Sequence, residues 1–164
     1  MKTLLIFLIL ILNAFSVIAQ TSDKKTEYHI LERLPEWFMK DNPLNGLDLN
    51  DNYILDNRLN PLYLEADFNG DGNNDIAIPI KNKSNESLGF AIIHGKTNEV
   101  FIIGAGTKIK NALDDNLDYI DIWKINRKKI NEAGLGENTG TGKKGELILK
   151  NPSMQIEKSE LGGG

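Results

Sequence analysis

The sequence predicts an α+β fold, with an N-terminal helix packed on a mainly antiparallel β-sheet. Apolar side chains recur at helical spacing over residues 27–40, and short apolar runs bounded by or close to Gly, Asn, Asp or Pro follow from residue 62 onward. Several connections between these runs are too short for a parallel crossover, such as residues 81–88 and 95–99. A leading helix followed by strands joined in this way is typical of an α+β domain.

The first element that we expect is a secretory signal peptide over residues 1–19. Lys2 precedes a nearly unbroken apolar run over residues 4–12, and the segment ends in small and mixed residues at VIA. The apolar run is shorter than the roughly 20 residues that a membrane span needs, so an uncleaved membrane anchor is the weaker alternative. We therefore expect cleavage after Ala19 and a secreted or periplasmic protein with no membrane contact.

The remaining chain, residues 20–164, has the length of one globular domain, which we expect to end in a flexible C-terminal tail. It contains no cysteine, which excludes disulfides, thiolate metal sites and cysteine nucleophiles. The formal net charge of the whole chain is −4 and its lysines are scattered. We expect no nucleic-acid partner, because such proteins need a basic stripe that meets the phosphates.

Residues 27–40 predict one amphipathic helix or two short ones, with a break or restart at Pro35, because proline has no amide hydrogen and clashes with the preceding turn. Residues 42–60 are rich in Asn, Asp and Gly, which favours a loop. Residues 133–145 contain five glycines and predict a second, flexible loop. The expected strands are residues 62–66, 75–80, 89–94, 100–103, 119–125, 146–149 and 154–157.

One segment, residues 67–75 with the sequence DFNGDGNND, has a pattern that indicates metal binding. Calcium takes six to eight hard oxygen ligands, and a tight loop directs alternate side chains toward the ion. Gly72 stands at position 6, where such a loop turns sharply. Three carboxylates in nine residues also repel one another unless a cation compensates them. The expected Ca²⁺ ligands are the side chains of Asp67, Asn69, Asp71 and Asp75 and the carbonyl of Asn73.

The alternative for this segment is a polar turn that leads into a strand and binds no metal. Against it stands a resemblance to the calcium motif of FG-GAP/VCBS-type repeats, in which Asp-Phe-Asn-Gly-Asp-Gly is followed by two variable residues, an Asp and a strand. The resemblance covers only about residues 62–80 and implies one calcium-binding loop between two strands, held by the same five positions. A β-propeller is not expected, because the chain has a single clear copy of the motif.

The chain is also similar to small exported proteins of uncharacterised function from Bacteroidetes-like bacteria. The similarity rests on an Asn-Pro-x-Tyr-x-Glu-type strand at residues 60–65 that precedes the calcium motif. It names no activity. Residues 48–56 place oxygens at the same four positions as the main motif, but Tyr53 replaces the turn glycine, so a second, weak ion site there is an open alternative.

The leading functional hypothesis is an exported, non-enzymatic domain in which calcium has a structural role. One alternative is a small hydrolase with an acidic site, and another is an interaction or inhibitor module for a second exported protein, whose identity the sequence does not give. His29 and His94 have no partners at a spacing that predicts a catalytic triad or a zinc site. The candidate carboxylates of the hydrolase are Asp114, Asp115, Asp118 and Asp121.

Overall fold

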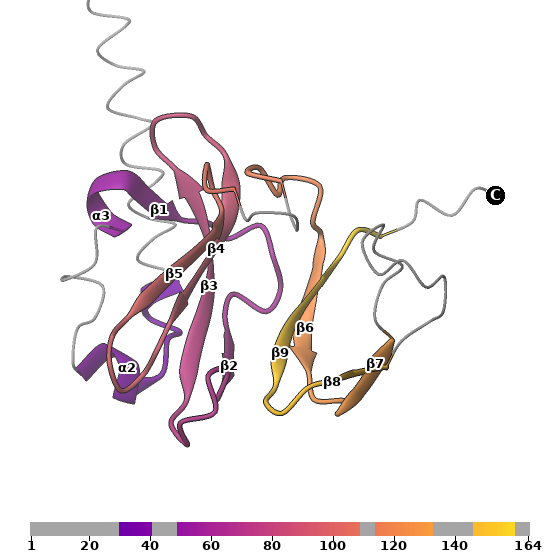
Figure 1. Cartoon of the computed structure of the whole chain (residues 1–164). Helices are drawn as coiled ribbons and strands as arrows, with labels where there is room; N and C mark the ends of the chain where they lie inside the picture. Colours follow the sequence, from indigo (N-terminus) through magenta and orange to yellow (C-terminus); the bar gives the residue numbers. More distant parts are fainter. Residues whose placement is uncertain (1–29, 41–48, 109–113, 133–145, 160–164) are drawn as a thin grey trace, which may run out of the picture.

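The structure is a computed structural model that describes residues 30–40, 49–108, 114–132 and 146–159 (Figure 1). The expected signal peptide, the expected loop at residues 133–145 and His29 lie outside these ranges. Among the helices of the described ranges, none is both long enough and apolar enough to cross a membrane.

The fold is mostly β, so the prediction of an α+β fold with an N-terminal helix packed on the sheet is wrong. Strand makes up 39% of the structure, and its longest described helix is α2 (Glu36–Lys40), with five residues. Residues 30–31 are helical and residues 32–34 form a turn, because Pro35 has no amide hydrogen with which to continue the helix. The break predicted at Pro35 is therefore present, but the described helical pieces on its two sides are short.

A five-stranded antiparallel sheet forms the centre of the protein (Figure 1). Its hydrogen-bonded order is β1-β3-β4-β5, and β2 also pairs with β3, beside the end of β3 that β1 does not reach. The connections after β3 and β4 form antiparallel hairpins, as their short lengths predict. The strands are β1 (Tyr53–Leu55), β2 (Leu64–Ala66), β3 (Asp75–Asn82), β4 (Leu88–Ile93) and β5 (Val100–Gly104).

Two antiparallel ribbons follow the sheet in the sequence, and Figure 1 shows them beside it. The first pairs β6 (Ile122–Asn126) with β9 (Ser153–Glu157), and the second pairs β7 (Ile130–Glu132) with β8 (Glu146–Ile148). β7 was not predicted. Neither were β1 and the one-turn helix α3 (Leu49–Asn52), which both lie in the stretch expected to be a loop.

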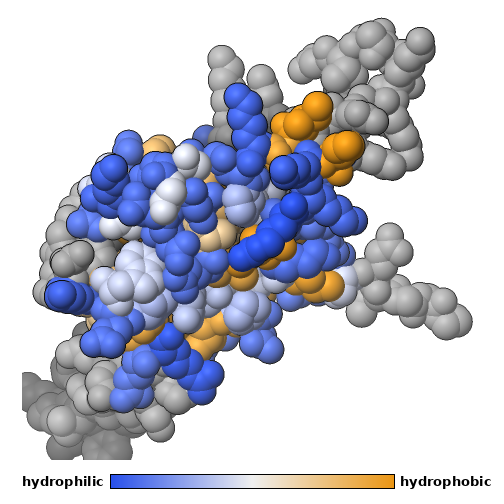
Figure 2. Space-filling model, turned by 90° about the horizontal axis from the view of Figure 1, so that it is seen from below, coloured by the Kyte–Doolittle hydropathy of each residue, from blue (hydrophilic) through white to orange (hydrophobic). Residues whose placement is uncertain are grey.

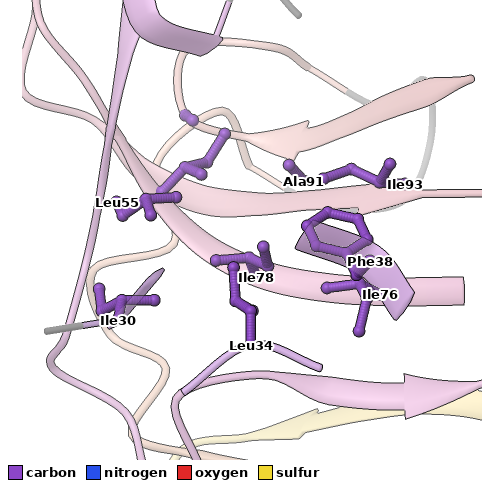
Figure 3. Packing of buried hydrophobic residues seen from close by; sticks show 10 residues of the cluster. Ile30, Leu34, Phe38, Leu55, Ile76, Ile78, Ala91 and Ile93 are labelled. Atoms are coloured by element: carbon purple, nitrogen blue, oxygen red, sulfur yellow. The ribbon is translucent and has the colours of Figure 1, made fainter. Parts of the chain in front are cut away.

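The core lies on both faces of the sheet. One face carries Ile76, Ile78 and Ile80 of β3, which pack with Ile30, Leu34 and Phe38 of the N-terminal segment, as Figure 3 shows for most of them. The opposite face carries Ala77 and Phe90, which pack with Trp123 of the β6–β9 ribbon. Because side chains alternate along a strand and both faces are covered, β3 is buried along its first six residues. The protein therefore has three layers, with the sheet in the middle.

The connection from β1 to β2 fastens the β6–β9 ribbon to the sheet. Arg58 donates hydrogen bonds to the carbonyls of Ile120 and Leu117, the second at 3.0 Å. Trp123 donates from Nε1 to the carbonyl of Pro61 at 2.8 Å, while its ring stacks on Phe90 with centroids 5.3 Å apart. Polar contacts and apolar packing together hold the ribbon against the second face.

Candidate metal centre

The predicted calcium loop joins two strands that lie side by side. Ala66, the last residue of β2, pairs with Asp75, the first residue of β3, and residues 67–74 form the connection between them. The positions of the loop are therefore fixed at both ends by the sheet.

The carboxylate of Asp67 lies inside the curve of the loop. Its Oδ1 accepts hydrogen bonds from the amides of Gly70, at 2.6 Å, and Asp71, at 3.1 Å. Its Oδ2 accepts one from the amide of Gly72, at 3.0 Å. Three successive backbone donors thus face this one carboxylate and partly compensate its charge.

The next two expected ligands lie close to Asp67. The side-chain oxygen of Asn69 accepts a hydrogen bond from the amide of Asp71 at 2.9 Å, and the same amide contacts Asp67. The oxygens of Asp67 and Asn69 therefore lie on the same side of the loop. The side chain and the backbone amide of Asn73 both donate to Asp71 Oδ1, at 3.0 and 2.8 Å. These bonds, with a smaller contribution from the charge of Lys96, lower the pKa of the Asp71 carboxyl.

Two glycines make this curvature available to the backbone. Gly70 and Gly72 have φ angles of 81° and 86°, a left-handed conformation that residues with a side chain rarely adopt. Gly72 is the turn glycine that the sequence pattern predicts at position 6. The side chains of Asn69, Asp71 and Asn73 are exposed, and that of Asp67 is half-buried, so solvent reaches this part of the loop.

Asp75 occupies a different environment from the other expected ligands, since it is fully buried. Its Oδ2 accepts hydrogen bonds from the amides of Phe68, at 2.8 Å, and Asn69, at 3.2 Å. Its Oδ1 accepts one from the amide of Gly95, at 3.1 Å, in the turn between β4 and β5. A carboxylate oxygen has about two lone pairs, so these bonds leave only Oδ1 with room for a further partner.

A further carboxylate, which precedes the predicted motif in the sequence, also holds the loop. Glu65 on β2 accepts hydrogen bonds at Oε1 from Asn74 Nδ2, at 2.7 Å, and from Trp37 Nε1, at 2.9 Å. The backbone of Gly95 lies so close to the carbonyl of Asn74 that an added Cβ would come within 2.0 Å of it. The sequence analysis missed Glu65 and Gly95, because both contacts depend on strand pairing rather than on a local pattern.

The donor atoms of the loop suit a calcium ion. All of them are oxygens of carboxylates, amides or the backbone, the hard ligands that calcium takes, and water can fill positions left open in an exposed loop. Within the described ranges, three or more His, Cys, Asp or Glu side chains do not converge into one metal-ligating group. The buried position of Asp75 explains this, because its carboxylate faces backbone amides.

Residues 49–56 do not form a loop like that of residues 67–75. In the described part, residues 49–52 are helical and residues 53–55 pair with β3 as strand β1. The carboxylate of Asp56 accepts a hydrogen bond from Arg58 Nε at 2.7 Å, so its partner is a guanidinium. The segment lacks the turn that would bring its oxygens together.

The carboxylates of the hydrolase alternative, Asp114, Asp115, Asp118 and Asp121, are all exposed. Asp121 accepts hydrogen bonds from the hydroxyl and the amide of Ser159, which lower the pKa of its carboxyl. His94 packs its ring on Phe101 with centroids 4.9 Å apart. These contacts describe a solvated acidic segment and a histidine packed on Phe101, whose Nδ1 also lies 3.9 Å from Glu99 Oε2.

Apolar side chains also reach the surface, and Figure 2 shows them as separate groups on a mostly hydrophilic face. The most exposed of those described are Ile130 and Ile148, at 61% and 69%, which stand opposite each other on β7 and β8.

Comparisons with protein-family models, with curated proteins and with solved structures found no match to this chain.

Proposed function

We propose that the protein is an exported, non-enzymatic calcium-binding domain in which the ion at residues 67–75 has a structural role. The observation that supports this proposal most directly is the position of the Asp67 carboxylate, which lies inside the loop beside the side-chain oxygen of Asn69. A cation at this place would meet two oxygens that the backbone already holds on one side of the loop.

The proposed ligands differ in how freely they can approach an ion. The side chains of Asp67, Asn69 and Asp71 and the carbonyl of Asn73 lie in the solvent-accessible part of the loop. Asp67 can contribute only through Oδ2 and Asp75 only through Oδ1, since the other oxygen of each carboxylate already accepts two backbone amides. Water would complete the six to eight oxygens that calcium prefers.

The ion would act on the join between two strands. Asp67 follows the last residue of β2 and Asp71 lies midway along the connection to β3, so neutralising both carboxylates removes a repulsion within one tight loop. Calcium sites of extracellular modules are often weak, with Kd of roughly 0.1–1 mM, because ambient calcium is plentiful. Such an affinity fits a structural ion rather than a signal.

Isothermal titration of residues 20–164 with calcium chloride, after treatment with chelator, tests the proposal. We expect one site with Kd of roughly 0.1–1 mM, and much weaker binding of magnesium, which demands a smaller octahedral shell and dehydrates reluctantly. A titration that gives no heat and no change in the melting temperature at 10 mM calcium, about tenfold above the weakest expected Kd, contradicts it. The intact mass of the exported protein tests export separately, since a mass that still includes residues 1–19 contradicts cleavage after Ala19.

An interaction module is the second candidate function, and the exposed pair of Ile130 and Ile148 favours it. Two large apolar side chains in register on one ribbon form a surface that a second exported protein could cover. Replacing Ile148 with lysine should then abolish capture of that protein by the tagged domain and leave the calcium titration unchanged. Equal capture by both forms would reject this candidate.

A further inference from the structure

The calcium loop touches a part of the chain that lies far away in sequence. A Cβ added to Gly70 would come within 2.5 Å of both Oδ1 and Nδ2 of Asn151, a distance that real Cβ atoms do not reach. The amide group of Asn151 therefore lies directly against the backbone of the loop. This contact joins the β2–β3 connection to the turn between β8 and β9.

The two positive-φ glycines of the loop differ in this respect. Gly70, with φ of 81°, has Asn151 in the space that a side chain would occupy. Gly72, with φ of 86°, has nothing within 4 Å of that space. The left-handed backbone conformation favours glycine at both positions. The contact with Asn151 is a second reason for glycine at Gly70 only.

Asn151 stands two residues before β9, and β9 is one of the two strands of the outer ribbon. A two-stranded ribbon is marginally stable alone, so its attachment to the sheet decides whether it stays ordered. Along β9, Met154 and Ile156 attach it through apolar packing against the second face of the sheet. Asn151 adds a close contact between its amide group and the backbone of the loop at Gly70.

We propose that Asn151 is a positioning residue for the calcium loop, and that calcium in turn tightens the attachment of the β6–β9 ribbon. This inference rests on the proposed calcium site. Side chains that hold a metal site from outside the ligand shell typically change metal affinity by about 10–100-fold when they are removed. Linkage is reciprocal, so a contact that strengthens calcium binding is itself strengthened when calcium binds.

The test measures calcium affinity and backbone hydrogen exchange on residues 20–164, with calcium chloride as the only probe. We expect Asn151→Ala to raise the calcium Kd by about tenfold. Calcium should slow amide exchange in residues 153–157 of the unmodified protein and should no longer do so in this variant. Asn57→Ala, at an exposed asparagine of the β1–β2 connection, is the matched control and should change neither readout.

A double-mutant cycle separates the contact from the backbone strain. Gly70→Ala introduces backbone strain and also a steric clash with Asn151, whereas Gly72→Ala introduces only backbone strain. The loss of calcium affinity caused by Gly70→Ala should therefore shrink by at least about threefold when Asn151 is already alanine. The loss caused by Gly72→Ala should be the same in both backgrounds.

The outcomes distinguish this inference from the proposed function. Calcium binding with an unchanged Kd in Asn151→Ala, and an unchanged exchange response in residues 153–157, overturns the role of Asn151 and leaves the calcium site intact. Absence of binding in the unmodified protein overturns both. If Asn151→Ala does not fold, Asn151→Ser takes its place in the titration, in the exchange measurement and in the cycle, with the same expected directions.

Discussion

Two segments of this protein, residues 48–56 and 67–75, place oxygen-bearing side chains at the same four positions, yet the structure gives them different forms. Residues 67–75 make a tight loop between paired strands. In the first segment, residues 49–52 are helical and residues 53–55 form a strand. The difference lies at position 6, where one segment has Gly72 in a left-handed conformation and the other has Tyr53 in a strand.

The comparison shows that the turn residue matters as much as the ligands. Side-chain oxygens at alternate positions converge only if the backbone curls around them, and that curl needs a φ that residues with a side chain rarely adopt. Tyr53 instead packs against the core and extends the sheet. Side-chain oxygens at the four ligand positions therefore do not predict a metal site unless glycine stands at the turn position.

Position 9 of the loop is Asp75, and Asp75→Ala should lower the free energy of unfolding more than any other change proposed below. Asp75 accepts hydrogen bonds from three backbone amides while fully buried. A fully buried unpaired donor costs about 1–3 kcal/mol, and these three donors are only partly buried, so we expect a loss of about 3 kcal/mol in the free energy of unfolding. Urea denaturation in chelator measures it. A loss below about 1 kcal/mol would mean that water replaces the carboxylate at little cost.

Asp71→Ala should have the next largest effect, mainly in calcium. At about 100-fold excess over Kd, an ion that binds only the folded protein stabilises it by roughly 2.7 kcal/mol. For a domain of this size that corresponds to about 5–10 °C in melting temperature. Asp71 is exposed and precedes Gly72, so its removal should delete a charged ligand and leave the turn. Thermal melts in chelator, calcium and magnesium measure the effect, and equal melting of the unmodified protein in chelator and calcium contradicts it.

Asp56→Ala addresses the other segment. Its carboxylate is bonded to Arg58, which also holds the carbonyls of Leu117 and Ile120. Loss of this partly buried partner should lower the free energy of unfolding by about 1–2 kcal/mol, by the same amount in calcium and in chelator. Urea denaturation in both conditions checks this. A loss that appears only in calcium would instead indicate an ion site in residues 48–56.

The sequence predicted the features that depend on neighbouring residues. The hairpins of β3, β4 and β5 followed from short apolar runs bounded by turn residues and from short connections, and the turn at Gly72 followed from its place in the motif. The strand β1 was missed because it lies in a stretch whose Asn, Asp and Gly content favours a loop, and β7 was missed because its three residues include only one apolar side chain, Ile130.

The break at Pro35 was predicted, but the helical pieces around it are too short to form the helix expected on the sheet. Ile30, Leu34 and Phe38 recur every four residues and are all buried, so their spacing correctly marks a buried face. A single turn followed by the short helix α2 satisfies that spacing as well as a continuous helix does, and Pro35 decides between them. The contacts of Asp75 with Gly95 and of Gly70 with Asn151 join residues that are far apart in sequence, so no local pattern predicts them.

The smallest expected effect concerns Lys96, in the turn between β4 and β5. The hydrogen bond from Gly95 to Asp75 holds this turn beside the loop, and the charge of Lys96 contributes to the lowered pKa of Asp71. A positive charge at this place repels an incoming cation, so Lys96→Gln should lower the calcium Kd. Because Lys96 is exposed, the gain should be only about two- to threefold.

Salt should reduce this gain, because charges in solvent are screened over about 8–10 Å at ionic strengths near 0.1–0.15 M. Calcium titrations at low and high sodium chloride measure it. Lys128→Gln, at an exposed lysine in the connection between β6 and β7, is the control and should leave the Kd unchanged at both. A gain of equal size in the two variants would show that net charge alone sets the calcium affinity. A gain confined to Lys96→Gln would instead place the ion beside Asp71, in residues 67–75. An ion bound at residues 48–56 should not respond to Lys96→Gln.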